Sequence, residues 1–149
     1  GLTLNTAGAD PIEFGTNNVL RMLIDQLGNV GIGSSSPRVA LDVNGAIASK
    51  PAVNVTGATA DFVSNNIAYT AQNCGTFALW NLKDGATYTF AVQGTSSTTC
   101  IFNAFSGAGS GALTVKMPPG HGATTATFQT LYSFLVAGST VYVSWIPGY

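Results

Sequence analysis

His121 is the only histidine in the chain, so it is the only base that could complete a Ser-His-Asp arrangement. It lies in a loop-like segment, Pro118 to Thr125, between two expected strands. The chain contains no Gly-x-Ser-x-Gly motif, which exposes the nucleophilic serine in many hydrolases. We therefore predict no catalytic residue, and we interpret His121 as a loop or interface histidine that could contact a ligand.

Two carboxylates, Asp61 and Asp84, are the only ones after residue 50 that could form the acid and base pair of a glycosidase. Asp84 precedes Gly85 between two β-rich runs, and Asp-Gly is a common sequence in tight hairpin turns. We predict that Asp84 forms such a turn. A glycan-degrading enzyme remains the least favoured alternative.

Cys74 and Cys100 are the only cysteines, and they fall on two expected neighbouring strands separated by one hairpin. That placement allows a disulfide, while two buried thiols acting as small apolar side chains remain the alternative. Neither cysteine has a second Cys or His nearby at the spacing of metal ligands. We predict no metal site.

Glycines surround Ile32 in a pattern that begins like a dinucleotide-binding loop. The position of the third glycine is Ser36, however, and Pro37 follows it where a helix would have to begin. The pattern therefore indicates a turn between strands, and we predict no cofactor.

The composition limits the partner classes. Charged residues make up only 7% of the chain and the net charge is -1, so no basic surface for nucleic acid is expected. The apolar runs are much shorter than the roughly 20 residues of a membrane-spanning helix, which predicts no membrane insertion. Because the chain starts at Gly1 within patterned sequence, we interpret it as part of a longer polypeptide.

Short runs rich in Val, Ile, Thr, Tyr and Phe alternate with Gly and Pro, a pattern typical of all-β proteins. The break at Lys50-Pro51 separates a segment 1–50 from a segment 51–149. In the second segment we expect strands at Ala68-Tyr69, Thr76 to Trp80, Thr87 to Val92, Cys100 to Phe105, Leu113 to Met117, Thr127 to Val136 and Val141 to Ile146. Seven or eight strands predict a β-sandwich or jelly-roll-like domain.

The first segment contains elements that are too short to build a core. Its expected strands lie around Ile12 and Phe14, Val30 and Ile32, Leu41 and Val43, and Ile47, with Asn44-Gly45 as a turn. Residues Asn18 to Leu27 fit a helix and a strand equally well. Exposing Phe14, Val30, Ile32, Leu41 and Val43 would cost roughly 1.5–3 kcal/mol for each large side chain. We therefore expect other copies to cover this face, with three chains packed as a β-prism-like shaft.

Aromatic side chains offer faces for a ligand. Strand alternation places Tyr142 and Ser144 on one face and Trp145 on the other, toward the core or a subunit interface. The candidate ligand-binding residues are His121, Tyr149, Tyr142, Trp80 and Lys83.

Two stretches resemble a known family. Residues 21–37, RMLIDQLGNVGIGSSSP, followed by 41–45, LDVNG, resemble the shaft segment that precedes tip domains in phage tail fibres and in fibre-like surface proteins of predatory bacteria. Residues 80–85 and 141–149 are similar to tip domains of the latter. The resemblance implies a trimeric, β-rich shaft and a C-terminal recognition domain, and it favours a strand over a helix for Val19 to Asp25. Gly28, Gly31, Gly33 and Gly45 would permit positive φ angles or close backbone approach there.

Together these observations predict an all-β protein with a fibre shaft segment (1–50) and a C-terminal tip (51–149). We expect a non-enzymatic homotrimeric adhesin, at a cell surface or on a virion tail fibre. Its expected ligand is a cell-surface glycan or another envelope component, bound through hydrogen bonds and aromatic stacking. A purely structural tip that caps the trimer is the alternative.

Overall fold

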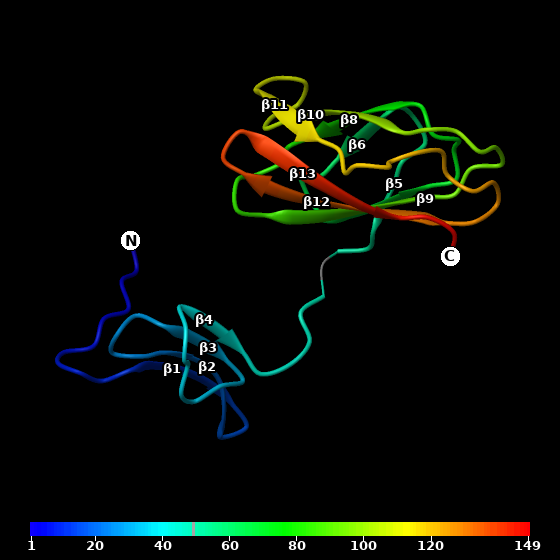
Figure 1. The fold of residues 1–149 in the computed structure, drawn as a ribbon. Coiled ribbons are helices and arrows are strands. Elements are labelled where there is room, and N and C mark those ends of the chain that lie inside the picture. The colour runs from blue at the N-terminus through cyan, green and yellow to red at the C-terminus, as the bar shows by residue number, and fades with distance from the viewer. Residues whose placement is uncertain (49) are drawn as a thin grey trace. The chain divides into compact units, whose positions relative to one another are not determined.

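The computed structural model describes residues 1–48 and 50–149, and every regular element in them is a β-strand (Figure 1). The chain divides into two compact units, Gly1–Ala48 and Ser49–Tyr149. The division lies within two residues of the Lys50-Pro51 break, and Ser49 itself lies outside the described residues. The all-β prediction is confirmed.

The first unit is one four-stranded sheet in the order β1-β2-β3-β4. Its strands are β1 (Ile12–Thr16), β2 (Val19–Ile24), β3 (Val30–Ile32) and β4 (Leu41–Val43), with β3 and β4 parallel and the other pairs antiparallel. The strand favoured for Val19 to Asp25 is confirmed, and the helical alternative is wrong. The element expected at Ile47 is also wrong, because Ile47 lies outside any strand and is exposed.

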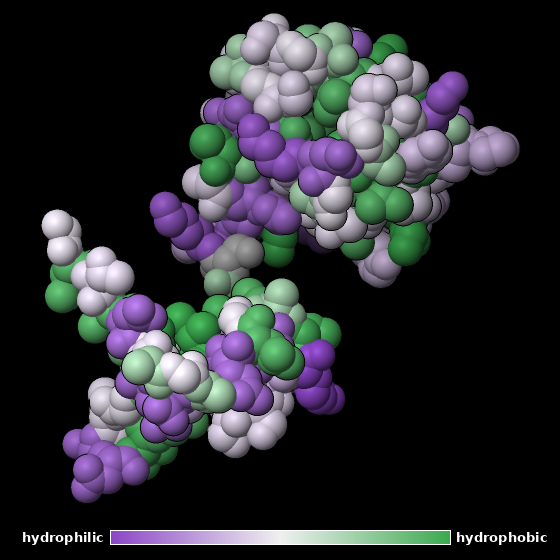
Figure 2. Space-filling model, turned by 90° about the vertical axis from the view of Figure 1, so that its left-hand side faces the viewer, coloured by the Kyte–Doolittle hydropathy of each residue, from purple (hydrophilic) through white to green (hydrophobic). Residues whose placement is uncertain are grey.

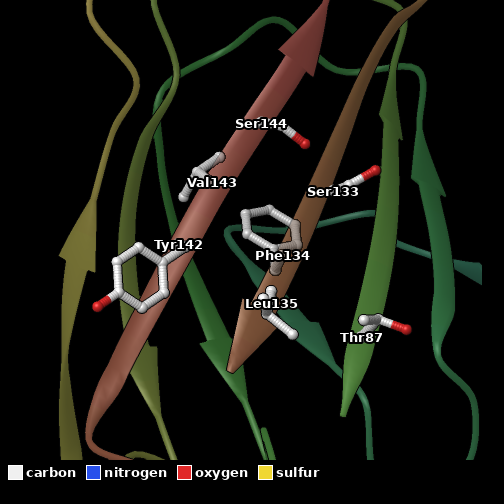
Figure 3. Close-up of a pocket in the computed structure, with 7 residues that line it drawn as sticks. All are labelled: Thr87, Ser133, Phe134, Leu135, Tyr142, Val143 and Ser144. Atoms are coloured by element: carbon white, nitrogen blue, oxygen red, sulfur yellow. The ribbon is translucent and has the colours of Figure 1, made fainter. Parts of the chain in front are cut away.

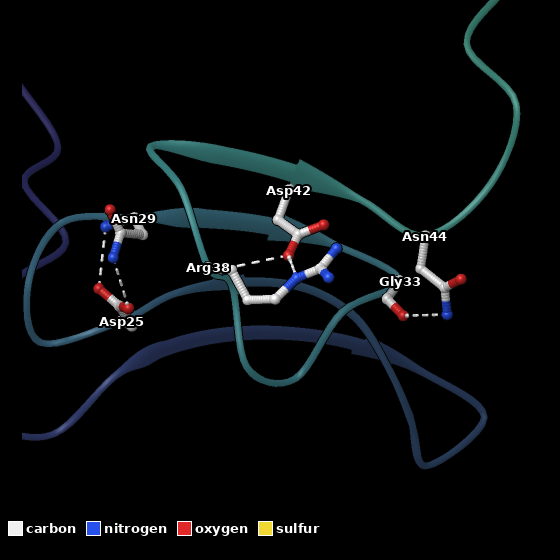
Figure 4. A network of polar contacts seen from close by, with 6 residues as sticks. All are labelled: Asp25, Asn29, Gly33, Arg38, Asp42 and Asn44. Carbon is white, nitrogen blue, oxygen red and sulfur yellow. Dashed lines mark hydrogen bonds and ion pairs between the residues drawn. The ribbon is translucent and has the colours of Figure 1, made fainter.

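The turn between β2 and β3 is organised by Asp25 (Figure 4). Its carboxylate accepts hydrogen bonds from the backbone N–H groups of Leu27 and Asn29, both at 2.8 Å, and from the Asn29 amide at 3.0 Å. Burial alone would raise the pKa of Asp25, but the bonds from Asn29, Leu27 and Gly28 outweigh it and hold the pKa below its usual value. Gly28 adopts a positive φ of 83° in this turn, as expected.

The connection from β3 to β4 covers one face of this sheet. Gly31 is buried against it so closely that a Cβ atom would overlap the Ser34 carbonyl oxygen. Arg38 donates from its backbone N–H and from Nε to Asp42, at 3.1 and 3.0 Å (Figure 4). The hydrogen bond from Arg38 is the main cause that lowers the pKa of Asp42. Glycine is thus required at position 31 for close approach.

The second unit is a nine-stranded arrangement in the order β5-β7-β9-β12-β13-β11-β10-β8-β6. The bounds are β5 (Val53–Asn54), β6 (Thr59–Asp61), β7 (Ile67–Thr70), β8 (Thr76–Trp80), β9 (Thr87–Val92), β10 (Ile101–Phe105), β11 (Ala112–Lys116), β12 (Thr130–Ala137) and β13 (Thr140–Ile146). The strands β5 and β6 were not predicted, and β12 begins three residues later than expected, since Thr127 has a positive φ of 67°.

From β5 to β10 the chain alternates between two layers and winds like a solenoid around the core. Strands β5, β7 and β9 stack parallel in one layer, and β6, β8 and β10 stack parallel in the other. Strand β11 pairs with β10 and β13, while β12 pairs with β9 and β13, so the two layers are joined through β11. Consecutive strands from β5 to β10 are therefore linked by crossovers and not by hairpins.

Two sequence predictions are corrected by this winding. Asp84 and Gly85 form a turn, but it connects β8 to β9 in opposite layers, so no hairpin is made there. Asp84 instead accepts a hydrogen bond from the Gly138 N–H at 2.7 Å, which ties this crossover to the β12–β13 turn. Likewise Cys74 and Cys100 directly precede β8 and β10, which are neighbours as expected, but the two strands are parallel and are linked through β9 in the other layer, so no hairpin separates them.

The core of the second unit lies between the layers and is rich in aromatic rings. Ring centroids of Phe77 and Phe90 lie 5.1 Å apart, and Phe102 lies 4.9 Å from Tyr132 and 5.1 Å from Phe134. Buried and exposed residues alternate along β12 and β13, as strand periodicity predicts. Trp145 packs against this core, as expected for its face of β13.

Candidate functional site

The predicted ligand-binding residues lie at separate places in the second unit. Trp80 is half-buried on β8, next to Gly109, and Lys83 is exposed on the β8–β9 crossover, where Nζ donates to the Ser106 carbonyl at 3.1 Å. Tyr149 is exposed at the C-terminus, with its backbone N–H donating to the Gln129 carbonyl at 2.9 Å. Trp80 and Lys83 therefore both contact the turn between β10 and β11, whereas Tyr149 is bonded to the segment just before β12.

His121 lies at one end of the core rather than in an open loop. Its Nε2 atom is 3.3 Å from the hydroxyl of Tyr132, and its ring lies edge-on to Trp145 with centroids 5.0 Å apart. Tyr132 is fully buried, and burial raises its pKa to about 12, so its hydroxyl keeps its proton at neutral pH. The Tyr132 oxygen also lies 4.0 Å from Cys74 Sγ. His121 therefore anchors the loop before β12 onto the core.

This contact predicts a pH-dependent stability. Burial lowers the pKa of His121 below its ordinary value of 6.5, so the unfolded chain binds more protons near that pH. The stabilisation is therefore present above pH 6.5 and is lost as the pH falls through the lowered folded value. In urea melts of the wild type, the urea concentration at the unfolding midpoint should fall as the pH is lowered below about 6.5. His121→Gln should lack that component of the pH dependence, and identical pH profiles for the two proteins would contradict the prediction.

Cys74 and Cys100 are joined in a disulfide, with Cα atoms 4.5 Å apart and both residues buried. The bond connects the two chain segments that enter neighbouring strands β8 and β10. Sequence reasoning left free thiols as the alternative, and the structure does not have them.

The two carboxylates considered for glycosidase chemistry have structural partners. Asp61 accepts hydrogen bonds from the Asn81 amide at 2.7 Å and from the Val63 N–H at 3.0 Å. Asp84 is engaged by Gly138, as described above. Within residues 1–48 and 50–149, no group of three His, Cys, Asp or Glu side chains could hold a metal ion, and no helix is long and apolar enough to cross a membrane.

Tyr142, another predicted ligand-binding residue, lines a pocket. The pocket has a volume of about 270 Å³ and lies on the outer face of the second unit, over β9, β12 and β13 (Figure 3). Thr87, Ser133 and Ser144 contribute hydroxyl groups, and Leu135 and Tyr142 contribute exposed apolar surface. The buried residues Phe134 and Val143 complete the lining, which contains no charged side chain. Leu135, Ser133, Ser144 and Thr87 were not predicted, although their alternation with core residues pointed to this face.

A second notable surface lies on the first unit, on the sheet face opposite the buried Gly31. The strand register places eight apolar side chains there in two rows across all four strands. The rows are Ile12, Ile24, Val30 and Leu41, then Phe14, Met22, Ile32 and Val43. Exposed fractions are 41% for Phe14, 39% for Ile32 and 58% for Leu41, and none of the eight is buried. We call these eight residues the apolar face, and Figure 2 shows hydrophobic side chains reaching the surface of the molecule.

The other face of the same sheet has a different character. Its central row consists of Glu13, Leu23, Gly31 and Asp42, of which the last three are buried. Leu23 is the only buried large hydrophobic residue of the first unit. A 48-residue unit with one such side chain lacks the core that an independent domain needs.

Comparison with protein-family models, with curated proteins and with solved structures finds no match to this chain.

Proposed function

We propose that this chain is a shaft-plus-tip part of a homotrimeric, fibre-like adhesin, in which three first units pack as a β-prism and three second units form the recognition tip. The observation that carries the proposal is the apolar face of the first unit. This face consists of eight apolar side chains in two uninterrupted rows, without a charged residue among them. The first unit has no core of its own in which these side chains could be buried.

Other copies of the same chain are the partner that this face fits. A flat face made only of apolar rows is complementary to a second such face, and closed symmetry lets every copy bury it equally. Burying one large side chain contributes roughly 1.5–3 kcal/mol, so several per chain would stabilise a three-chain bundle. The resemblance of residues 21–37 and 41–45 to the shafts of trimeric fibres supports an assembly of three copies over one of two.

The second unit suits recognition without catalysis. It has its own core between two layers of strands and a disulfide, which suits a rigid support. Its outer pocket presents hydroxyl groups and an aromatic ring without charge, as expected for binding a neutral cell-surface glycan. A disulfide is typical of oxidising environments, and a place outside the cell or on a virion follows from the proposal.

Light scattering on the purified chain tests the assembly. The expected mass is about three times the 15.2 kDa of one chain. The trimer should then bind to cells or to a glycan array without releasing products from a broad polysaccharide panel. A monomer would overturn the shaft proposal, and released sugar products would favour the glycan-degrading alternative.

A purely structural tip is the second candidate. Ile67, Tyr69 and Ile146 are about half exposed on the outer sheet face, and such apolar residues could pack between copies. A trimer that binds neither cells nor any glycan on the array would favour this role over recognition.

A further inference from the structure

Side chains of different size follow one another along the outer face of β12 and β13. Outward residues of β12 and β13 pair across the strands as Leu131 with Ile146, Ser133 with Ser144, and Leu135 with Tyr142. The two small serines therefore lie between two pairs of large apolar residues. The result is a trough whose accessible lining is mostly apolar, with the two serines at its floor, and the pocket of about 270 Å³ is lined by the serine pair and by Leu135 and Tyr142 (Figure 3).

Hydrogen-bonding groups in the trough are free to act on a ligand. Ser133, Ser144 and Tyr142 are exposed, and within the described part of the chain their hydroxyls make no hydrogen bond. Thr87 adds a further exposed hydroxyl on β9, opposite Leu135 in the strand register. Each hydroxyl can both donate and accept, which suits a ligand that carries hydroxyl groups of its own.

Charge excludes other ligand classes. No carboxylate lines the pocket, so a metal ion or a cationic group has no partner there. The nearest cation by strand register is Lys116, which pairs with Tyr142 at the rim of the trough. One lysine at the rim is not the cluster of cations or backbone N–H groups that binds phosphates. The volume is slightly below the roughly 300 Å³ at which sites for drug-sized ligands begin, so a single ring fits better than an extended chain.

We propose that this trough is a subsite for one neutral pyranose unit of a surface glycan. The apolar face of the sugar ring lies against Tyr142 and Leu135, and its hydroxyl groups exchange hydrogen bonds with Ser133 and Ser144. An amphipathic aromatic ring beside hydroxyl groups matches the two-sided character of a pyranose. This inference rests on the proposed recognition function and adds the place and the ligand class.

The test uses the whole chain and the methyl glycosides of glucose, galactose, mannose and N-acetylglucosamine as probes, with saturation-transfer NMR and titration. At least one probe should bind, and Tyr142→Ala should weaken that binding by about tenfold. The double variant Ser133→Ala with Ser144→Ala should weaken it as well. Tyr69→Ala is the matched control, because Tyr69 is an exposed tyrosine in β7 of the same layer and does not line the trough.

Each other outcome overturns the inference. Binding that is unchanged in Tyr142→Ala would place the ligand elsewhere, while leaving the proposed adhesin function intact if the trimer still attaches to cells. A failure of all four probes to bind would exclude a neutral pyranose subsite. If Tyr142→Ala changes the mass of the assembly and not the affinity for a probe, the trough is a contact between copies.

Discussion

Ile32→Asp is expected to dissociate the proposed trimer into chains of 15.2 kDa. Ile32 lies in the second row of the apolar face, between Met22 and Val43 in the register. In the proposed assembly that row meets the equivalent rows of two other copies. Three carboxylates would then be buried near one axis without a cationic partner, and an unpaired buried charge costs several kcal/mol or more.

Light scattering at matched concentrations measures this effect, with circular dichroism in the near ultraviolet to report on the second unit. Trp80 and Trp145 both lie in the second unit, so their signal should persist when the first unit loses its partners. This readout separates dissociation from general misfolding.

Leu27→Asp is the control for that variant. Leu27 is 80% exposed in the β2–β3 turn, outside the apolar face. The Leu27→Asp substitution introduces the same negative charge into the same unit. The Leu27→Asp protein should remain trimeric. A trimeric Ile32→Asp protein would contradict the proposal that the apolar face holds the copies together.

Removing the disulfide is expected to lower the free energy of unfolding by roughly 3.5 kcal/mol, the chain-entropy estimate for a loop of 26 residues. The large effect has a topological reason. Between Cys74 and Cys100 the chain runs once through each layer, as β8 and then β9, so the bond closes one full winding of the solenoid-like coil. Both cysteines are buried.

Urea melts of the wild type and of the Cys74→Ser, Cys100→Ser double variant measure this difference. A reductant strong enough to open the bond in urea should lower the midpoint of the wild type toward that of the double variant. The double variant itself serves as the control, because its midpoint should not respond to reductant. Equal midpoints of the two proteins without reductant would contradict the prediction.

Local patterns were sufficient for the strands with clear two-residue alternation. Strands β8 and β9 have the predicted bounds, and alternation in β13 correctly put Tyr142 outside and Trp145 against the core. These features follow from which side chains avoid water, and each strand shows that in its own sequence. The short β5 and β6 lacked such a signal, since two or three residues cannot display a period.

The pairing of strands could not be inferred in the same way. Asp84-Gly85 has the local geometry of a turn in either case, and whether the chain returns beside β8 or crosses to the other layer depends on residues far along the sequence. His121 shows the same limitation, because its contacts with Tyr132 and Trp145 join three different segments. A loop histidine and an anchoring histidine look identical in sequence.

The sequence by itself determined the all-β class, the division near residue 50, the apolar character of the first sheet and the low charge of the whole surface. Only the tertiary structure decided the winding between layers, the anchoring of His121, and the trough between Leu135 and Tyr142. The physical reason is the sequence separation of the contacts involved. The preference of each residue for burial produces a two-residue alternation that can be read within one strand, whereas strand pairing and sites arise from contacts between segments that are far apart in the sequence.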